Sequence, residues 1–487
     1  MAVTAEPIAM TDEQLRQFIT NGYLVIQSQL PAEFHARIFD KLHNLASGSG
    51  HFGNNLMPMV PELNQVIEEP KVSGALSRIL GNNYSLHAHR ALHANPPSSD
   101  QQAWHKDSYW GYTRRVRNHR PWWAMLMYYP QATPQKTGPT GLLSGSQYFH
   151  QLLPNDCSNV AACGAAGTLV LIHYDLWHRK MLNKSTRDRY MVKFQFTRLS
   201  PPDVGSIKNP PAWRRPKDRP KFDLNPIWRS TWDWLHGVEP MPKYATAKDP
   251  SSQLTHQLYG DDEVRALQAA FQLSGQARAG SQKALDTLSA ALNANLEEND
   301  NTRRYADNGT YWRADAAARS AAHGLVNVGE NALKVLSAAA KSGSPRGRKH
   351  AVFALGEIGT RAAQNILVDS LSDDDLHVII NAIEAIGFTP PTKKATEALI
   401  RHLDHGESEV RFDAALSLLR FAANPACVLK NHMVKALSTS LNDSNRYVSA
   451  YAEQALQLLG TKEALQVLVP FLSKTRWCSY TDNTTPF

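Results

Sequence analysis

Apolar and polar positions follow two different rhythms along the chain. Before about residue 206 they alternate as in β-strands, whereas after residue 259 Ala and Leu recur every three or four residues, as in helices. We therefore expect a multidomain protein with one β-rich and one helical part. The expected divisions are a β-rich domain at 1–205, a basic strap rich in Pro and Trp at 206–258, a helical domain at 259–475 and a tail at 476–487.

The β-rich part opens with a helix, because Thr11 and Gln14 form a capping box and Asn21-Gly22 ends the apolar stripe. Strands are expected at 23–26, 84–94, 122–129, 167–173 and 190–197. The last of these alternates cleanly, with Tyr190, Val192, Phe194 and Phe196 on one face and Met191, Lys193 and Gln195 on the other. Strands of this length between turns containing Gly and Pro predict an antiparallel sandwich or jelly roll.

The strap between the two parts is crowded with prolines, basic residues and tryptophans. Prolines forbid long helices and favour extended structure, so we expect an extended segment. Trp213, Trp228, Trp232 and Trp234 have large apolar areas to bury, which predicts packing against one or both domains.

The helical part repeats itself with a period of around 30 to 40 residues, which is typical of a helical solenoid. Versions of one helix, such as AVFALGEIG and NAIEAIGF, are each followed by a second apolar helix. Six such pairs are expected, and over residues 259–474 the pattern resembles HEAT-type repeats. Solenoids of this kind bind many unrelated partners, so the resemblance says little about chemistry.

Composition narrows the class of protein. The chain has 487 residues, 42% of them hydrophobic and 20% charged, which is ordinary for a folded soluble protein. No run approaches the length of a membrane span, and the amino terminus lacks the basic and apolar regions of a secretory signal. The four cysteines include no Cys-x-x-Cys pair, which indicates reduced thiols in a cytoplasmic protein.

Candidate chemistry is concentrated at Trp104-His105-Lys106-Asp107 and Leu176-Trp177-His178. Alternate residues of an extended segment point the same way, so His105 and Asp107 share a face. Sheet closure that adds His178 would give two imidazoles and one carboxylate, the set that holds one face of an octahedral Fe(II) and leaves positions open. The rival histidines are His87, His89, His93 and His173, for which roles in the sheet or in substrate contact are favoured.

Around this triad, residues 11–200 resemble the phytanoyl-CoA dioxygenase family of Fe(II)- and 2-oxoglutarate-dependent oxygenases. NGYLVI resembles the opening helix-to-strand segment, and NPPSSDQQAWHKDSYW resembles the approach to the His-x-Asp pair. TGPTGLLSGSQ and GTLVLIHYDLWHRKMLNKSTRDR resemble the Gly-rich element and the strand of the distal histidine. The chain departs from the family pattern at Asn95, where lysine is common, and in Ser144-Gly145-Ser146-Gln147.

The resemblance implies a double-stranded β-helix, a jelly roll of the cupin-like kind, in which His105, Asp107 and His178 bind iron. It implies that Arg189, eleven positions after the distal histidine, binds the far carboxylate of 2-oxoglutarate, with Arg187 and Arg198 as rivals on spacing. Trp123 occupies the position beside this cosubstrate, or Trp122 does if the register differs by one. Because related halogenases need a small residue in place of Asp107, hydroxylation or desaturation is expected.

We therefore predict an enzyme that uses Fe(II), 2-oxoglutarate and O2 to hydroxylate or desaturate an unactivated C–H bond of a small organic metabolite, with release of succinate and CO2. The alternative is a protein, peptide or carrier-bound substrate that the repeats recruit. The net charge of +8 and two basic clusters, one at Arg114, Arg115, Arg117 and Arg120 and one at 208–221, are compatible with an anionic substrate, although a solvated surface is the simpler interpretation. No base-reading module is found, which disfavours nucleic acid.

Overall fold

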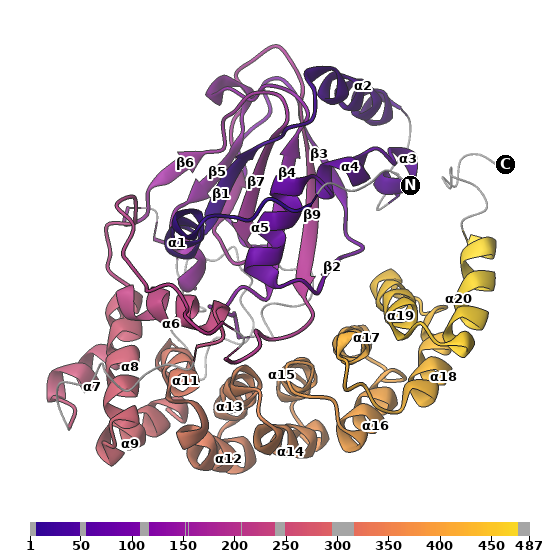
Figure 1. Cartoon of the computed structure of the whole chain (residues 1–487). Coiled ribbons are helices and arrows are strands. Elements are labelled where there is room, and N and C mark those ends of the chain that lie inside the picture. The colour runs from indigo at the N-terminus through magenta and orange to yellow at the C-terminus, as the bar shows by residue number, and fades with distance from the viewer. Residues whose placement is uncertain are drawn as a thin grey trace.

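The computed structural model describes residues 6–48, 55–107, 116–150, 152–153, 155–205, 207–238, 249–294 and 316–475. The expected tail at 476–487 lies outside these residues. None of the described helices combines the length and the apolar character that a membrane crossing requires. Figure 1 shows a β domain and an arc of helices, whose inner side faces that domain.

The β domain begins with helices and ends with strands. Its α-helices are α1 (Asp12–Asn21), α2 (Ala32–Ser47), α3 (Leu56–Met59), α4 (Leu63–Ile67) and α5 (Pro70–Leu80). Its strands are β1 (Tyr23–Gln27), β2 (Tyr84–Leu86), β3 (Ala91–Asn95), β4 (Trp123–Tyr129), β5 (Thr140–Leu143), β6 (Asn159–Ala161), β7 (Thr168–His173), β8 (His178–Lys180) and β9 (Arg189–Arg198). Helix α1 has the expected capping box between Thr11 and Gln14.

The strands form two antiparallel sheets, as the jelly-roll prediction requires. The larger sheet has the order β1-β7-β4-β9-β2, with β3 also paired to β9, and the smaller has the order β6-β5-β8. Strand β9 alternates as predicted: Val192, Phe194 and Phe196 belong to the core under the amino-terminal helices, and Met191 belongs to a different core cluster. The other face of β9, which carries Arg189, Lys193 and Gln195, is therefore the inner face of the sandwich.

The single strand expected at 84–94 is wrong. It is two strands, β2 and β3, that pair with different parts of β9: Leu86 lies opposite Phe196, whereas Ala91 lies opposite Lys193. The register changes by two residues between these pairs, and the segment 87–90 belongs to neither strand. Alternation of residue types does not reveal such a shift, because both strands meet the same partner.

The strap also differs from the extended segment expected. It contains an eleven-residue helix, α6 (Asn225–Leu235), in which Pro226 occupies the first turn, where a missing N–H costs nothing. Trp228 and Trp232 of this helix are fully buried, and Trp234 packs against Trp122 of the β domain. The expectation that its tryptophans make the strap an ordered, packed segment is confirmed.

Six helix pairs lie within the described residues of the helical part, as the repeat pattern predicts. They are α8 (Glu263–Arg278) with α9 (Gln282–Leu292), α11 (Ala316–Val328) with α12 (Leu333–Ser342), α13 (Pro345–Ile358) with α14 (Arg361–Asp369), α15 (Leu376–Ile386) with α16 (Lys393–His402), α17 (Ser408–Ala423) with α18 (Lys430–Ser440), and α19 (Arg446–Leu459) with α20 (Lys462–Thr475). Helix α7 (Ser252–Leu258) precedes the boundary expected at residue 259 and packs against α8.

The first helices of successive pairs contact the β domain, which positions the solenoid against it (Figure 1). Glu357 of α13 accepts a hydrogen bond from Trp122, and Asn381 of α15 accepts one from the backbone N–H of Val116. Arg420 of α17 is 2% exposed and reaches Thr197 of β9. The solenoid is thus bound to the β domain along much of its length.

Candidate metal centre

The two sheets bring His105, Asp107 and His178 together. His105 forms an isolated antiparallel bridge with His178, the first residue of β8, through backbone hydrogen bonds of 3.0 and 2.9 Å. Asp107 follows two residues later on the same side, as expected for an extended segment. Its Oδ1 lies 4.0 Å from His105 Nε2 and 3.7 Å from His178 Nε2, and the three ligand atoms all lie within 4.8 Å of one another.

The hydrogen bonds of the two imidazoles direct the same nitrogen of each toward Asp107. His105 Nδ1 bonds the carbonyl of Ala103 at 3.0 Å, and His178 Nδ1 bonds that of Leu176 at 2.9 Å. A carbonyl only accepts, so both Nδ1 atoms carry a proton, which leaves Nε2 of each ring as the nitrogen available to a metal. Burial, followed by the charge of His178, lowers the pKa of His105 to about 4, so His105 is a neutral ligand at pH 7.

Asp107 is the anionic member of the triad, and Lys193 of β9 holds it. Lys193 Nζ donates to Asp107 Oδ2 at 2.7 Å, which leaves Oδ1 facing the imidazoles. Burial alone would raise the pKa of Asp107, but the Lys193 charge and the His178 contact outweigh it and hold that pKa well below its usual range. Sequence reasoning missed Lys193, although a lysine on the buried face of an alternating strand is itself a signal.

These donors fit a metal such as Fe(II), because two neutral imidazoles and one carboxylate form the facial set that non-haem iron prefers. Among the described residues, no other group of His, Cys, Asp or Glu side chains meets the same geometric requirement. The rival His173 lies in β7, where its Nδ1 faces the backbone N–H of Asp175 at 3.1 Å. His87 and His89 contact tyrosines of the solenoid instead.

Arg189 lies on the same inner face of β9 as Lys193 and is 1% exposed. Its Nε and Nη2 donate to the carbonyl of Gly138 at 3.1 and 2.9 Å, while Nη1 is buried without a hydrogen-bond partner. Gly138 has φ +66°, and a Cβ there would lie 2.4 Å from the side-chain nitrogen of Asn95, so this carbonyl position requires glycine. Burial lowers the pKa of Arg189, and its unused donor fits an anionic ligand.

The other arginines considered for this position face elsewhere. Arg187 is exposed, and Arg198 donates to the backbone carbonyls of Ile79 and Ser200. Of the two tryptophans, Trp122 stacks on Phe388 of the solenoid with ring centroids 3.9 Å apart. Trp123 instead contacts His87 and Tyr174 and lies on the inner-facing row of β4.

The basic cluster after the triad is not a positive rim. Arg117 forms a buried ion pair with Asp175, and Arg120 pairs with Glu357 at 3.0 Å. Arg114 and Arg115 lie outside the described residues. Arg117 and Arg120 both form ion pairs inside the fold. They are therefore neither a positive rim that attracts an anionic substrate nor part of a solvated surface.

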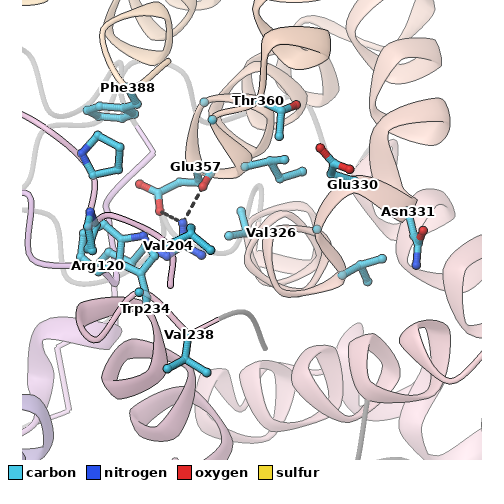
Figure 2. A pocket seen from close by; sticks show the side chains of 18 of the residues that line it. Arg120, Val204, Trp234, Val238, Val326, Glu330, Asn331, Glu357, Thr360 and Phe388 are labelled. Atoms are coloured by element: carbon cyan, nitrogen blue, oxygen red, sulfur yellow. Dashed lines mark hydrogen bonds and ion pairs between the residues drawn. The ribbon is translucent and has the colours of Figure 1, made fainter. Parts of the chain in front are cut away.

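A cavity of about 570 Å³ lies between the strap, the β domain and the solenoid, and none of its lining residues belongs to the triad. Figure 2 shows Arg120 and Glu357 facing each other beside Trp234, with Phe388 close by. Arg120 and Glu357 are paired across the domain boundary, so this cavity is a feature of the interface.

Two regions of the chain match models of known families. Residues 18–191 match the family model of phytanoyl-CoA dioxygenase (PhyH), and residues 314–420 match HEAT repeats. No curated protein matches the chain.

Among solved structures, EvdMO1 is 16% identical over 38% of this chain and 49% of its own, with a TM-score of 0.32. EctD from S. alaskensis with 2-oxoglutarate and 5-hydroxyectoine is 15% identical over 45% and 89%, with a TM-score of 0.34. HygX from Streptomyces hygroscopicus with nickel and 2-oxoglutarate bound is 15% identical over 39% and 88%, with a TM-score of 0.32. The chain thus spans about half the length of EvdMO1.

Proposed function

Because residues 18–191 form a PhyH domain and the chain continues into HEAT repeats, we propose that the protein is an Fe(II)- and 2-oxoglutarate-dependent dioxygenase acting on a small organic molecule. The overall reaction would convert a C–H bond, O2 and 2-oxoglutarate into C–OH, succinate and CO2. The observation that carries the proposal is the convergence of His105, Asp107 and His178 in a sandwich whose inner face also carries the buried Arg189, with Nη1 unpaired among the described residues.

Each residue has a distinct task in this proposal. His105, Asp107 and His178 would hold Fe(II), which supplies the oxidative chemistry when bound. Lys193 positions Asp107 so that one carboxylate oxygen faces the imidazoles. Arg189 would bind the distal carboxylate of 2-oxoglutarate through Nη1, the donor that has no partner in the described part of the chain. Trp123 is the tryptophan proposed to lie beside this cosubstrate, because Trp122 is used at the solenoid interface.

A small-molecule substrate is favoured over a recruited macromolecule by the position of the solenoid. Its helices α13, α15 and α17 contact the protein's own β domain through Glu357, Asn381 and Arg420. A macromolecule recruited along that inner side would have to displace these contacts. The same arrangement supports a role for the repeats as a fused scaffold.

The test uses the full chain with Fe(II) and 2-oxoglutarate. Without oxygen, we expect a metal-to-ligand charge-transfer absorption band, and with oxygen we expect succinate to form. His105→Ala removes one imidazole and should abolish both signals, whereas His432→Ala, at an exposed solenoid position, should leave both intact. Succinate formation by His105→Ala at the rate of the unaltered chain would refute the assignment. Incubation with a metabolite extract would then identify the substrate as a compound that gains one oxygen atom.

A further inference from the structure

Strand β9 orders the groups around the metal centre along one line. Lys193 reaches Asp107 and so marks the metal centre on the inner face of the sheet. At about 3.3 Å per residue, Arg189 begins about 13 Å along the strand in one direction and Gln195 about 7 Å in the other. If Arg189 binds 2-oxoglutarate, the side marked by Gln195 is the one left for the organic substrate.

Gln195 itself indicates that this side accepts a ligand. Its side chain is completely buried, yet neither its amide oxygen nor its amide nitrogen has a hydrogen-bond partner among the described residues. Leaving a buried amide unpaired is costly, so such groups usually meet a ligand or water. Gln195 lies opposite Met125 of β4. The backbone carbonyl of Gln195 accepts a hydrogen bond from the backbone N–H of His87.

The solenoid covers this side through α19. Tyr447 stacks on His87 with ring centroids 4.9 Å apart and hydrogen-bonds His89 Nδ1 through its hydroxyl at 2.9 Å. Tyr451, one turn later, hydrogen-bonds His87 at 2.8 Å. The His87 ring also contacts Trp123 on the inner-facing row of β4, with ring centroids 5.6 Å apart, which connects Tyr447 to the inner face of the sheet.

We propose that Tyr447, a residue of the HEAT-like solenoid, belongs to the active site and faces the organic substrate on the open side of the metal centre, opposite the 2-oxoglutarate site. This inference rests on the proposed function. If Tyr447 faces the substrate, the solenoid lines one side of the active site. The substrate would therefore be confined between the inner face of β9 and helix α19.

Fluorine NMR of the full chain tests this arrangement. 3-Fluorotyrosine in place of Tyr447 keeps the ring and the hydroxyl, so the contacts with His87 and His89 are retained. Co(II), a paramagnetic ion, is compared with diamagnetic Zn(II) in the triad. We expect Co(II) to shift and broaden the fluorine signal at position 447. 3-Fluorotyrosine in place of Leu458, an exposed residue on the same helix, should change much less.

The outcomes separate the inference from the function on which it rests. If Co(II) binds and His105→Ala prevents binding, but the signal at 447 is as insensitive as that at 458, Tyr447 is not part of the active site. If His105→Ala leaves Co(II) binding unchanged, the metal centre itself is misassigned and the proposed function fails with it. A Co(II) effect at 447 that disappears in His105→Ala supports both.

Discussion

The β domain and the solenoid use polar residues in different ways. In the β domain, three separate segments supply His105 with Asp107, His178, and Lys193, and these side chains converge on one point. In the solenoid, helices of neighbouring pairs pack mainly on one another, and polar residues such as Glu357 and Asn381 project onto the β domain. Assembly of the metal centre therefore depends on how the sheets bring these segments together. The solenoid contributes polar contacts along the surface that it presents to the β domain.

This difference predicts that the two regions respond differently to substitution. Changes at the metal centre should affect ligand binding more than stability, because the centre contains groups whose partners are missing from the protein. Changes along the interface should affect stability, because those groups are paired with one another. The predictions below run from the largest expected effect to the smallest.

Glu357→Ala should give the largest loss of stability. The Glu357 side chain is 3% exposed, pairs with Arg120 at 3.0 Å and accepts from Trp122 Nε1 at 2.6 Å. Its removal takes the carboxylate from the buried Arg120, which keeps only the backbone carbonyl at position 357, and leaves Trp122 Nε1 without this acceptor; we expect a cost of about 3–5 kcal/mol in urea unfolding. Asp369→Ala, which breaks a pair with Lys394 in which both side chains are more than half exposed, should cost less than about 1 kcal/mol. Equal losses would mean that the interface does not depend on this pair.

Arg189→Ala should weaken 2-oxoglutarate binding strongly. The variant loses the buried donor Nη1, so KM for 2-oxoglutarate in a succinate assay should rise about 100-fold, or about 2.7 kcal/mol. Arg189→Lys keeps the charge without the planar fork and should be intermediate. Arg187→Ala, at an exposed position two residues away, is the matched control. An unaltered KM in Arg189→Ala would transfer the role to Arg187 or Arg198.

Much of the fold could be predicted from the sequence, because each element carries its own local signal. Alternation in β9, the Thr11 capping box and the six helix pairs are confirmed. Two features could not be predicted. The break between β2 and β3 depends on the register with β9. Helix α6 depends on the position of Pro226, which is compatible with a helix only because it lies in the first turn. In both cases tertiary pairing decides the structure.

The candidate site divides in the same way. His105, Asp107 and His178 could be proposed because His-x-Asp and a distant histidine are recognisable residue types in order. Tyr447 could not, since a tyrosine has many ordinary roles, and the only signal for Lys193 is its place on the buried face of an alternating strand. Their positions follow from contacts with Asp107 and His89 that join residues far apart in the chain. Such contacts leave no periodic trace in a single sequence.

Gly356→Ala tests close packing within the solenoid. A Cβ at Gly356 in α13 would lie 2.4 Å from the Cβ of Ala385 in α15, so the two helices would have to separate. Overpacking costs about 1–3 kcal/mol, and the better helix propensity of Ala returns up to about 1 kcal/mol. We expect a net loss of about 1–2 kcal/mol in urea unfolding. Gly406→Ala, where a Cβ would meet nothing within 4 Å, should change stability little; a loss as large as that of Gly356→Ala would contradict the packing explanation.

Acid should weaken the interface through two stacked histidines. The rings of His119, from the β domain, and His323, from α11, lie 3.5 Å apart. Burial, followed by the charge of His173, lowers the pKa of His119 to about 3, and burial with the charge of His119 lowers the pKa of His323. The unfolded chain therefore binds more protons below pH 6.5, and stability falls as the pH drops from 6.5 toward about 3, by up to about 1.4 kcal/mol per pH unit for each histidine. In His119→Phe, the stability difference between pH 7.5 and 5.5 should shrink by about 1 kcal/mol, whereas the exposed control His432→Phe should keep it. The same difference in both variants would show that His119 is not a source of acid sensitivity.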